Sequence, residues 1–428
     1  MTDTTIVKVK GRRVWDSRGR PTVEAEVTLG CGAKGRAIAP AGASMGSAEA
    51  VDLRDGGERF GGMGVLRACA SINDEISGRL ESMSATDQVG VDKLMVELDG
   101  TSSRSRLGGN ALVATSMAVL HAAAAADQAP IWHYLAAGSK VRIPLPQIQI
   151  FGGGAHAERR VDIQDFMVVC PGASTFSQAL EWTAEIYRAA GARLRQSGKL
   201  RGVADEGGYW PVFGSNEEAL DMLVQSTVDA GFKPREQVGI FLDIAASEFG
   251  RDGRYVLGLE GKTLDTQGML DMLGRWLAAY PILSVEDPVA EDDPAGFRAF
   301  TAQHGSHCQV IGDDFLVTNA ERVRRAAEDQ SLNAVLIKPN QAGTITETYA
   351  AFQAGKRAGF GTIVSARSGE SEDVTIAHLS VGWDAGQLKV GSFSRSERMA
   401  KWNEVLRIEE ALGSQAAFAG WSALPFKP

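Results

Sequence analysis

Four apolar runs between residues 240 and 340 end in polar side chains that a buried strand does not need. The runs IFLD, ILSVED, CQVIGDD and NAVLIKPN carry Asp243, Glu286, Asp313 and Lys338 at or near their ends. Helix-like segments separate the runs, so the pattern predicts alternating strands and helices. In a βα barrel the carboxyl ends of the strands face the active site. We therefore expect three carboxylates and a lysine to converge on one mouth.

This combination predicts proton abstraction assisted by a metal. Three close carboxylates repel one another unless a cation neutralises them, and their hard oxygen ligands suit Mg²⁺. A divalent cation beside Lys338 would lower its pKa toward that of a working base. A metal that holds a substrate carboxylate, together with a neutral lysine, can remove the proton next to that carboxylate. The alternative is that each acid merely caps a helix or lies on the surface. Three acids and a lysine in phase favour the site.

Further polar residues follow predicted strands on either side of this stretch. They are His156 after the glycines of FGGGAHAERR, Gln164 and Asp165 in DIQDFM, Glu206 in ADEGG, Arg367 and Ser368 in SARSGESED, and Lys389 in GQLKVGS. Arg367 and Lys389 would add two cations to the same mouth. Such cations suit a small anionic substrate that carries phosphate and carboxylate groups.

The elements that position these residues predict two domains, as 428 residues exceed one ordinary core. Residues 6–29 alternate as two strands around a turn, and a third strand is expected to end at Ile38. The loop PAGASMGSAEA at 40–50 is small and glycine-containing, so we expect a mobile lid, with an ordinary flexible connection as the alternative. Residues 66–135 have a helical pattern. We predict an α+β domain over 1–138 and a βα barrel over 139–428.

Composition excludes several classes of partner. The hydrophobic content of 44% and charged content of 23% are typical of soluble globular proteins. A net charge of −9 argues against a nucleic-acid groove or an anionic membrane surface. The N-terminus has no apolar signal core, and the alanine-rich run near residue 120 is too short and too polar at its ends to span a membrane. Cys31, Cys69, Cys170 and Cys308 lack metal-ligand spacing, which predicts reduced core residues in a cytoplasmic protein.

Ordered motifs along essentially the whole chain resemble the enolase (phosphopyruvate hydratase) family. The motifs are VWDSRGRPTVEAEV, HAERRVDIQDFM, ADEGG, LDIAASEF, SVEDP, GDDFLVTN, LIKPNQAGT, RSGESED and LRIEEALG. The resemblance implies an α/β fold, in which an N-terminal α+β domain caps a TIM-like βα barrel whose first connection is irregular. It also implies a homodimer or higher homo-oligomer and a Mg²⁺-dependent lyase. Enolase-superfamily sites are known to pair a lysine or histidine base with Mg²⁺.

The resemblance assigns roles to the metal ligands and to the base. It implies that Asp243, Glu286 and Asp313 bind a first, tight Mg²⁺. A second Mg²⁺ is expected to bind with substrate near Ser44. Lys338 resembles the base that takes the proton from C2 of the substrate.

The remaining roles concern substrate binding and the leaving group. By resemblance, Glu206 assists departure of the group at C3, and Arg367 and Ser368 hold the phosphate with Ser44. Lys389 would hold the carboxylate and its enolate charge, and His156 matches a histidine on a mobile loop.

Some positions depart from the family pattern. Ala366 stands where the family has histidine in SHRSGE, and Gln164 is followed by Asp165 where the family has QEF, so this carboxylate is shorter by one C–C bond. Arg159 and Arg160 stand where small polar residues are common. The first two changes belong near the C3 hydroxyl, which needs acid help to leave, whereas phosphate needs less. The arginines could bind additional negative charge.

We therefore expect an enzyme that still forms an enolate but eliminates a different group. The specific hypothesis is the carboxyphosphonoenolpyruvate synthase branch of the family, in phosphinate antibiotic biosynthesis, where a C3 phosphate would leave. The first alternative is an ordinary phosphopyruvate hydratase with tolerated substitutions. The second is a non-catalytic scaffold, which predicts random loss of the site, whereas the metal ligands and both lysines are present.

Overall fold

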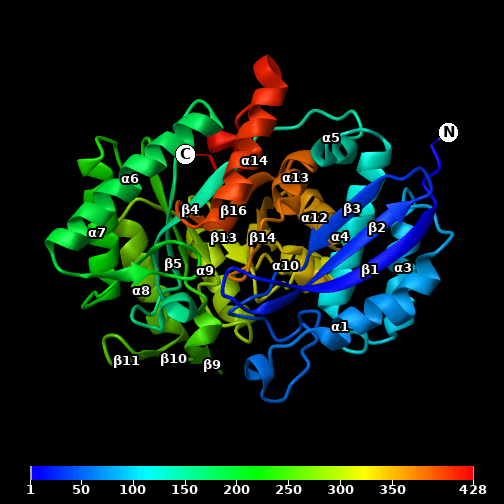
Figure 1. The fold of residues 1–428 in the computed structure, drawn as a ribbon. Coiled ribbons are helices and arrows are strands. Elements are labelled where there is room, and N and C mark those ends of the chain that lie inside the picture. The colour runs from blue at the N-terminus through cyan, green and yellow to red at the C-terminus, as the bar shows by residue number, and fades with distance from the viewer. Residues whose placement is uncertain (1, 428) are drawn as a thin grey trace.

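The N-terminal part of the chain forms a three-stranded antiparallel sheet in a computed structural model that describes residues 2–427 (Figure 1). Its strands are β1 (Ile6–Trp15), β2 (Pro21–Leu29) and β3 (Lys34–Ile38), in the order β1-β2-β3. The turn between β1 and β2 closes on one carboxylate oxygen of Asp16, which accepts the backbone N–H groups of Arg18 at 2.8 Å and Arg20 at 2.9 Å. The turn residues DSRGRP thus fold as the sequence predicts.

One long helix forms the core beneath this sheet. The helices here are α1 (Leu66–Ala70), α2 (Ser77–Leu80), α3 (Gln88–Asp99), α4 (Gly109–Ala126) and α5 (Ile131–Ala136). By length and composition α4 could cross a membrane, with a mean hydropathy of 1.3, but 89% of it is buried inside the structure. Its backbone approaches β3 so closely that a Cβ on Gly35 would lie 2.1 Å from the carbonyl oxygen of Ala118. The alanine-rich sequence of α4 permits this contact.

Eight strands close a barrel in the C-terminal part. They are β4 (Leu145–Gly152), β5 (Asp165–Val169), β8 (Gly239–Asp243), β12 (Ile282–Glu286), β13 (Gln309–Gly312), β14 (Ala334–Ile337), β15 (Gly361–Ser365) and β16 (Gly386–Ser392). Each pairs with the next, and β16 pairs with β4 to close the ring. β5 runs antiparallel to both β4 and β8, while the other neighbours are parallel. The expected barrel, with an irregular first connection, is confirmed.

Helices surround the barrel and two short strands extend it. The larger helices are α6 (Phe176–Gln196), α7 (Asn216–Asp229), α8 (Thr266–Ala279), α9 (Pro294–His304), α10 (Ala320–Glu328), α12 (Ile345–Arg357), α13 (Thr375–Gly382) and α14 (Ser396–Leu412). A single short turn, α11 (Pro339–Ala342), follows β14, and β6 (Leu200–Val203) and β7 (Tyr209–Pro211) lie beside β4. Side-chain caps begin several helices, for example Thr175 at α6 and Ser215 at α7. Because the strands pair side by side around the barrel, Asp243, Glu286 and Lys389 lie on one rim.

Two details differ from the sequence-based expectation. A small antiparallel sheet of β9 (Gly250–Arg251), β10 (Arg254–Leu257) and β11 (Lys262–Asp265) lies between β8 and α8. These strands were not predicted because they are short and mostly exposed, with Tyr255 as an anchor whose hydroxyl donates to Asp293 at 3.1 Å. All four cysteines are free thiols, but Cys31 is exposed, so the expectation of a core position is wrong for that residue. The domain boundary expected at residue 138 falls between α5 and β4 and stays a prediction.

The interior of the barrel contains a layer of glutamines. Gln147, Gln309 and Gln387 have no exposed surface. The amides of Gln147 and Gln309 donate to the side-chain oxygen of Gln387 at 2.9 and 3.1 Å, and Gln387 donates back to Gln309 at 2.7 Å. These bonds pair most of the amide groups, while the buried side-chain oxygen of Gln147 has no hydrogen-bond partner.

The contact of β3 with α4 leads to a stability prediction. Gly35→Ala should lower the free energy of unfolding by about 1–3 kcal/mol, because the added methyl group collides with the helix backbone. Gly78→Ala, on α2 of the same unit, has no atom within 4 Å of its new methyl group and should be neutral or slightly stabilising. Thermal unfolding of both variants checks this. Equal melting temperatures would mean that α4 yields without cost.

Candidate active site

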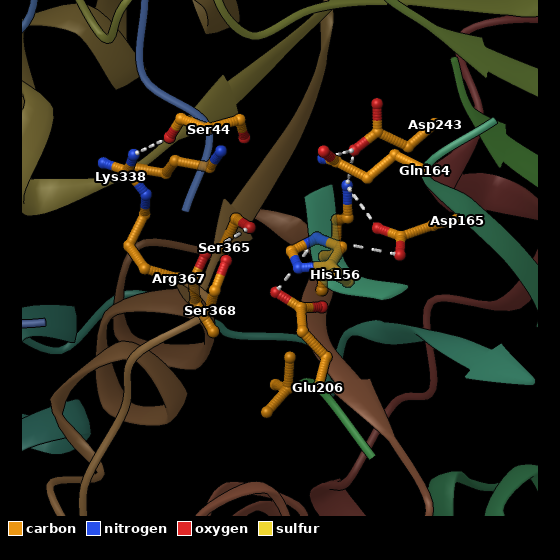
Figure 2. A pocket seen from close by; sticks show the side chains of 13 residues that line it. Ser44, His156, Gln164, Asp165, Glu206, Asp243, Lys338, Ser365, Arg367 and Ser368 are labelled. Atoms are coloured by element: carbon orange, nitrogen blue, oxygen red, sulfur yellow. Dashed lines mark hydrogen bonds and ion pairs between the residues drawn. The ribbon is translucent and has the colours of Figure 1, made fainter. Parts of the chain in front are cut away.

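A small cavity lies at the mouth of the barrel beneath the loops (Figure 2). Its lining residues are Ser44, His156, Gln164, Asp165, Glu206, Asp243, Lys338, Ser365, Ala366, Arg367, Ser368, Lys389 and Val390. The volume is about 20 Å³, enough for about one water molecule. This volume is smaller than a phosphorylated three-carbon acid would need. Eleven of the residues expected from the sequence thus meet at one place.

Lys389, on β16, lies among three buried carboxylates. Its ammonium group is 2.8 Å from an oxygen of Asp243, 2.9 Å from both oxygens of Glu286 and 3.6 Å from Asp165. Burial disfavours the charged amine, but Asp243 and Glu286 raise the pKa of Lys389 well above its ordinary value. The lysine therefore remains a cation and neutralises the strand ends of β8 and β12.

Lys338, the predicted base, directly follows β14 and contacts Asp313. A second carboxylate oxygen of Asp313 accepts the amide of Gln341 at 2.9 Å. Burial works against the ammonium form, but Asp313 outweighs it, so the pKa of Lys338 is raised. The lowered pKa expected beside a divalent cation stays a prediction, since the shift described here arises from the protein groups alone. A cation held by Asp313 would remove this effect by engaging the carboxylate.

The three predicted metal ligands fit Mg²⁺ by their chemistry. Asp243, Glu286 and Asp313 are almost completely buried, and they offer hard oxygen ligands at adjacent strand ends. Burial, together with the charge of Asp243, raises the pKa of Glu286 well above its ordinary value. This repulsion is what a divalent cation would relieve. In the structure Lys389 and Lys338 contact these acids and supply the positive charge.

Asp287 and Asp314 lie close to Asp313 and stiffen the same rim. Oxygens from these three acids lie within 4.8 Å of one another. Asp287 accepts the backbone N–H groups of Asp313 at 3.0 Å and Asp314 at 2.9 Å. Burial, followed by the charge of Asp313, raises the pKa of Asp314 to about 8. We regard Asp287 as the brace of the turn that presents Asp313.

A second cluster faces the cavity from a different side than Lys338 (Figure 2). The ring nitrogen Nε2 of His156 is 4.0 Å from Asp165 and 3.8 Å from Glu206, and Figure 2 shows the three side chains pointing toward one another. Burial and the charge of Glu206 raise the pKa of Asp165 to about 6. Burial would also raise the pKa of Glu206, but His156 and nearby cations lower it overall. The cluster's proton is thus favoured on Asp165, whereas the resemblance assigned the acid role to Glu206.

The loop at 40–50 lies closed over the cavity. The guanidinium of Arg367 donates to both oxygens of Glu49, at 2.8 and 3.2 Å, and to the backbone oxygen of Ser44 at 2.8 Å. The hydroxyl of Ser368 accepts the N–H of Ala43 at 3.2 Å. Groups of the loop therefore form hydrogen bonds with the side chains of Arg367 and Ser368, the two residues that were expected to hold phosphate. Movement of the loop stays a prediction.

Two predicted substrate ligands lie outside the cavity. Arg159 is 64% exposed and pairs with Glu248 at 2.8 Å, and Arg160 lies over the ring of Trp210 at 5.9 Å. Ala366 does line the cavity, and its backbone N–H donates to the carbonyl of Lys389 at 2.8 Å. The structure thus brings the alanine substitution to the site and leaves the arginines on its outer surface.

Several contributing residues were not found from the sequence. Ser365 and Val390 line the cavity, and Glu49 holds Arg367. Arg398, on α14, is fully buried and donates to the backbone carbonyls of Arg367 at 2.6 Å and Val390 at 2.8 Å. A cation on the buried face of a helix was the available signal for Arg398. The others gave no signal beyond their position at a strand end or in the loop.

Comparison with known proteins matches both halves of the chain. Residues 6–135 match the family model described as "Enolase, N-terminal domain", and residues 140–425 match "Enolase, C-terminal TIM barrel domain". A curated relative, "Enolase 1" of Desulfitobacterium hafniense (strain Y51), is 49% identical over 416 residues. The alignment covers 96% of this chain and 95% of the relative.

The carboxylate set predicts stabilisation by Mg²⁺. Saturating Mg²⁺ should raise the melting temperature. At a free Mg²⁺ concentration one hundred times its dissociation constant, the free energy of unfolding should rise by about 2.7 kcal/mol. Glu286→Gln should lose most of this gain, because it removes one charged ligand from the site. Asp271→Asn, on the exposed face of α8, is the matched control and should keep the full gain. Thermal scans with and without Mg²⁺ measure both. Equal gains in wild type and Glu286→Gln would reject this metal site.

Proposed function

The chain belongs to the enolase family of carbon–oxygen lyases, and from this we propose that it dehydrates 2-phosphoglycerate to phosphoenolpyruvate. The observation that carries the proposal is the cavity that Lys338 and the His156–Asp165–Glu206 cluster enter from different sides (Figure 2). One group can then take a proton while the other gives one. Identity to an enolase along nearly the whole chain supports this reaction above others.

Lys338 takes the proton from C2 in the proposed mechanism. The electrons of the C2–H bond pass first into the neighbouring carboxylate, which gives an enolate, and in a second step they form the C2–C3 double bond as the C3–O bond breaks. The departing hydroxide needs a proton, and we assign its delivery to Asp165, whose pKa is raised to about 6, rather than to Glu206, whose pKa is lowered. The products are water and the enol phosphate. Glu206 keeps its negative charge and favours the proton on Asp165.

The remaining side chains bind and orient the substrate. Arg367 and Ser368 take the phosphate once Glu49 has left Arg367, and Lys389 faces the substrate carboxylate. The family uses Mg²⁺, and at Asp243, Glu286 and Asp313 it would supply positive charge that stabilises an enolate. We propose one tight ion, with a second ion near Ser44 when substrate binds. A homo-oligomeric state and a cytoplasmic location remain proposals.

A different leaving group is the second candidate function. Ala366 lines the cavity where the family has histidine, and Asp165 is a short acid, so the region near C3 is roomier. Loss of a C3 phosphate from an O2-substituted glycerate, the carboxyphosphonoenolpyruvate synthase reaction, would use this room. The arginine part of that hypothesis is weaker, because Arg159 and Arg160 lie outside the cavity. The relative supports ordinary dehydration better.

Turnover of 2-phosphoglycerate tests the proposal directly. Purified protein with Mg²⁺ should form the enol product, followed by its absorbance, at a rate on the order of tens per second. Chelation of the metal is the control and should stop the reaction. Absent turnover, with Mg²⁺ stabilisation intact, would reject dehydration. Phosphate release from a C3-phosphorylated, O2-substituted glycerate would then test the second candidate.

The role of Lys338 has its own test. Lys338→Ala should slow exchange of the substrate's C2 proton with solvent by at least about 10²-fold, because no other base replaces the amine. Exchange is followed by NMR in deuterated water. Lys93→Ala, which removes an exposed lysine, should leave exchange unchanged. Retained exchange in Lys338→Ala would remove this residue as the base.

A further inference from the structure

We propose that Gln149 is a positioning residue that sets the spacing of the two acids at the leaving-group side of the site. This inference rests on the proposed elimination, since it concerns how Asp165 and Glu206 are held for proton transfer. Gln149 lies on β4, has no exposed surface and does not line the cavity. It therefore acts through other residues.

The amide of Gln149 joins Asp165 to the turn that carries Glu206. Its side-chain oxygen accepts the backbone N–H of Gly208 at 2.9 Å, and its NH₂ group donates to one carboxylate oxygen of Asp165. A backbone N–H can only donate, so the oxygen must face Gly208 and the NH₂ group must face Asp165. One side chain thus satisfies both partners, and its orientation is fixed by chemistry.

Two glycines make room for this side chain. A Cβ on Gly208 would lie 2.3 Å from the amide oxygen of Gln149. A Cβ on Gly152 would lie 3.4 Å from its nitrogen and 2.6 Å from the Cβ of Ala204. Of the paired glycines after Glu206, Gly208 therefore makes room for Gln149, while Gly207 adopts a φ of +95° in the turn. The backbone is shaped around a long amide.

Fixing one oxygen of Asp165 determines where the other points. The second oxygen lies 3.6 Å from Lys389, while the oxygen bound by Gln149 lies 4.0 Å from His156. On the other side, the carbonyl of Glu206 accepts the N–H of Ser392 at 2.8 Å, so the turn is held to the barrel. The long side chain of Gln149 and the short side chain of Asp165 together span the distance between the backbones of β4 and β5.

This shared span predicts reciprocal rescue. Gln149→Asn shortens the amide by one methylene, and Asp165→Glu lengthens the acid by one. Each single change should lower kcat by about tenfold or more and alter KM by less than about threefold, since the acid is misplaced but phosphate binding is not. The double variant Gln149→Asn/Asp165→Glu restores the total length and should regain most of the lost kcat.

A matched glutamine serves as control. Gln147 lies two residues earlier on the same strand, is equally buried, and donates to Gln387 rather than to an acid. Gln147→Asn should not rescue Asp165→Glu. Exchange of the C2 proton adds a second readout: Gln149→Asn should keep exchange while elimination falls. The proposal would be overturned if the losses of kcat in the single variants multiplied in the double variant. It would also be overturned if exchange of the C2 proton in Gln149→Asn fell as much as elimination.

Thermal unfolding separates this inference from the proposed function. If wild type does not turn over 2-phosphoglycerate, the proposed function fails, yet the melting temperatures of the four proteins still test the contact. Gln149→Asn withdraws the amide from Asp165 and from Gly208, and Asp165→Glu crowds it, so each single variant should melt lower. The double variant should recover the part lost at the contact with Asp165. Additive losses of melting temperature would overturn the role of Gln149.

Discussion

Charge balance among buried carboxylates is the constraint on which the site depends. The strand ends of β8 and β12, the turn after β13 and the start of β5 bring Asp243, Glu286, Asp313 and Asp165 to one rim, where water cannot screen them. Such a set is stable only with cations in contact. Lys389 and Lys338 fill this need at the floor of the cavity. The positions of the predicted metal ligands and of Lys338 therefore depend on one another.

Cations and acids also pair between the barrel and the loop over the cavity. Arg367 engages Glu49, as Lys338 engages Asp313 and Lys389 engages Asp243. The closed form satisfies its cations with its own acids, which explains why so little space remains. In the proposed reaction, an anionic substrate and its metal would exchange these internal partners for new ones, so no buried charge would be left alone if both entered together.

The sequence predicted most of the site because several barrel strands, such as β8 and β14, are apolar until they reach the rim. Polar residues that end such runs, as Asp243 and Lys338 do, have few structural explanations. What it could not predict were properties that depend on neighbours from distant segments. The raised pKa of Lys338 arises from Asp313. Asp165 and Glu206 are both buried, and their pKa values differ because His156 and nearby cations lower that of Glu206. The position of Arg159 depends on Glu248, in a segment whose strands are too short to recognise.

Because β5 runs antiparallel to its neighbours, its first residue lies at the rim of the barrel, where the other strands place their last residues. Asp165 is the first residue of its strand and pairs with Asp243, the last residue of β8, whereas Val169 at the far end pairs with Gly239. A library that randomises the last residues of every strand to alter substrate choice would therefore miss Asp165 and disrupt the closed bottom at Val169. Engineering of this barrel needs seven strands numbered toward the rim and one numbered away from it.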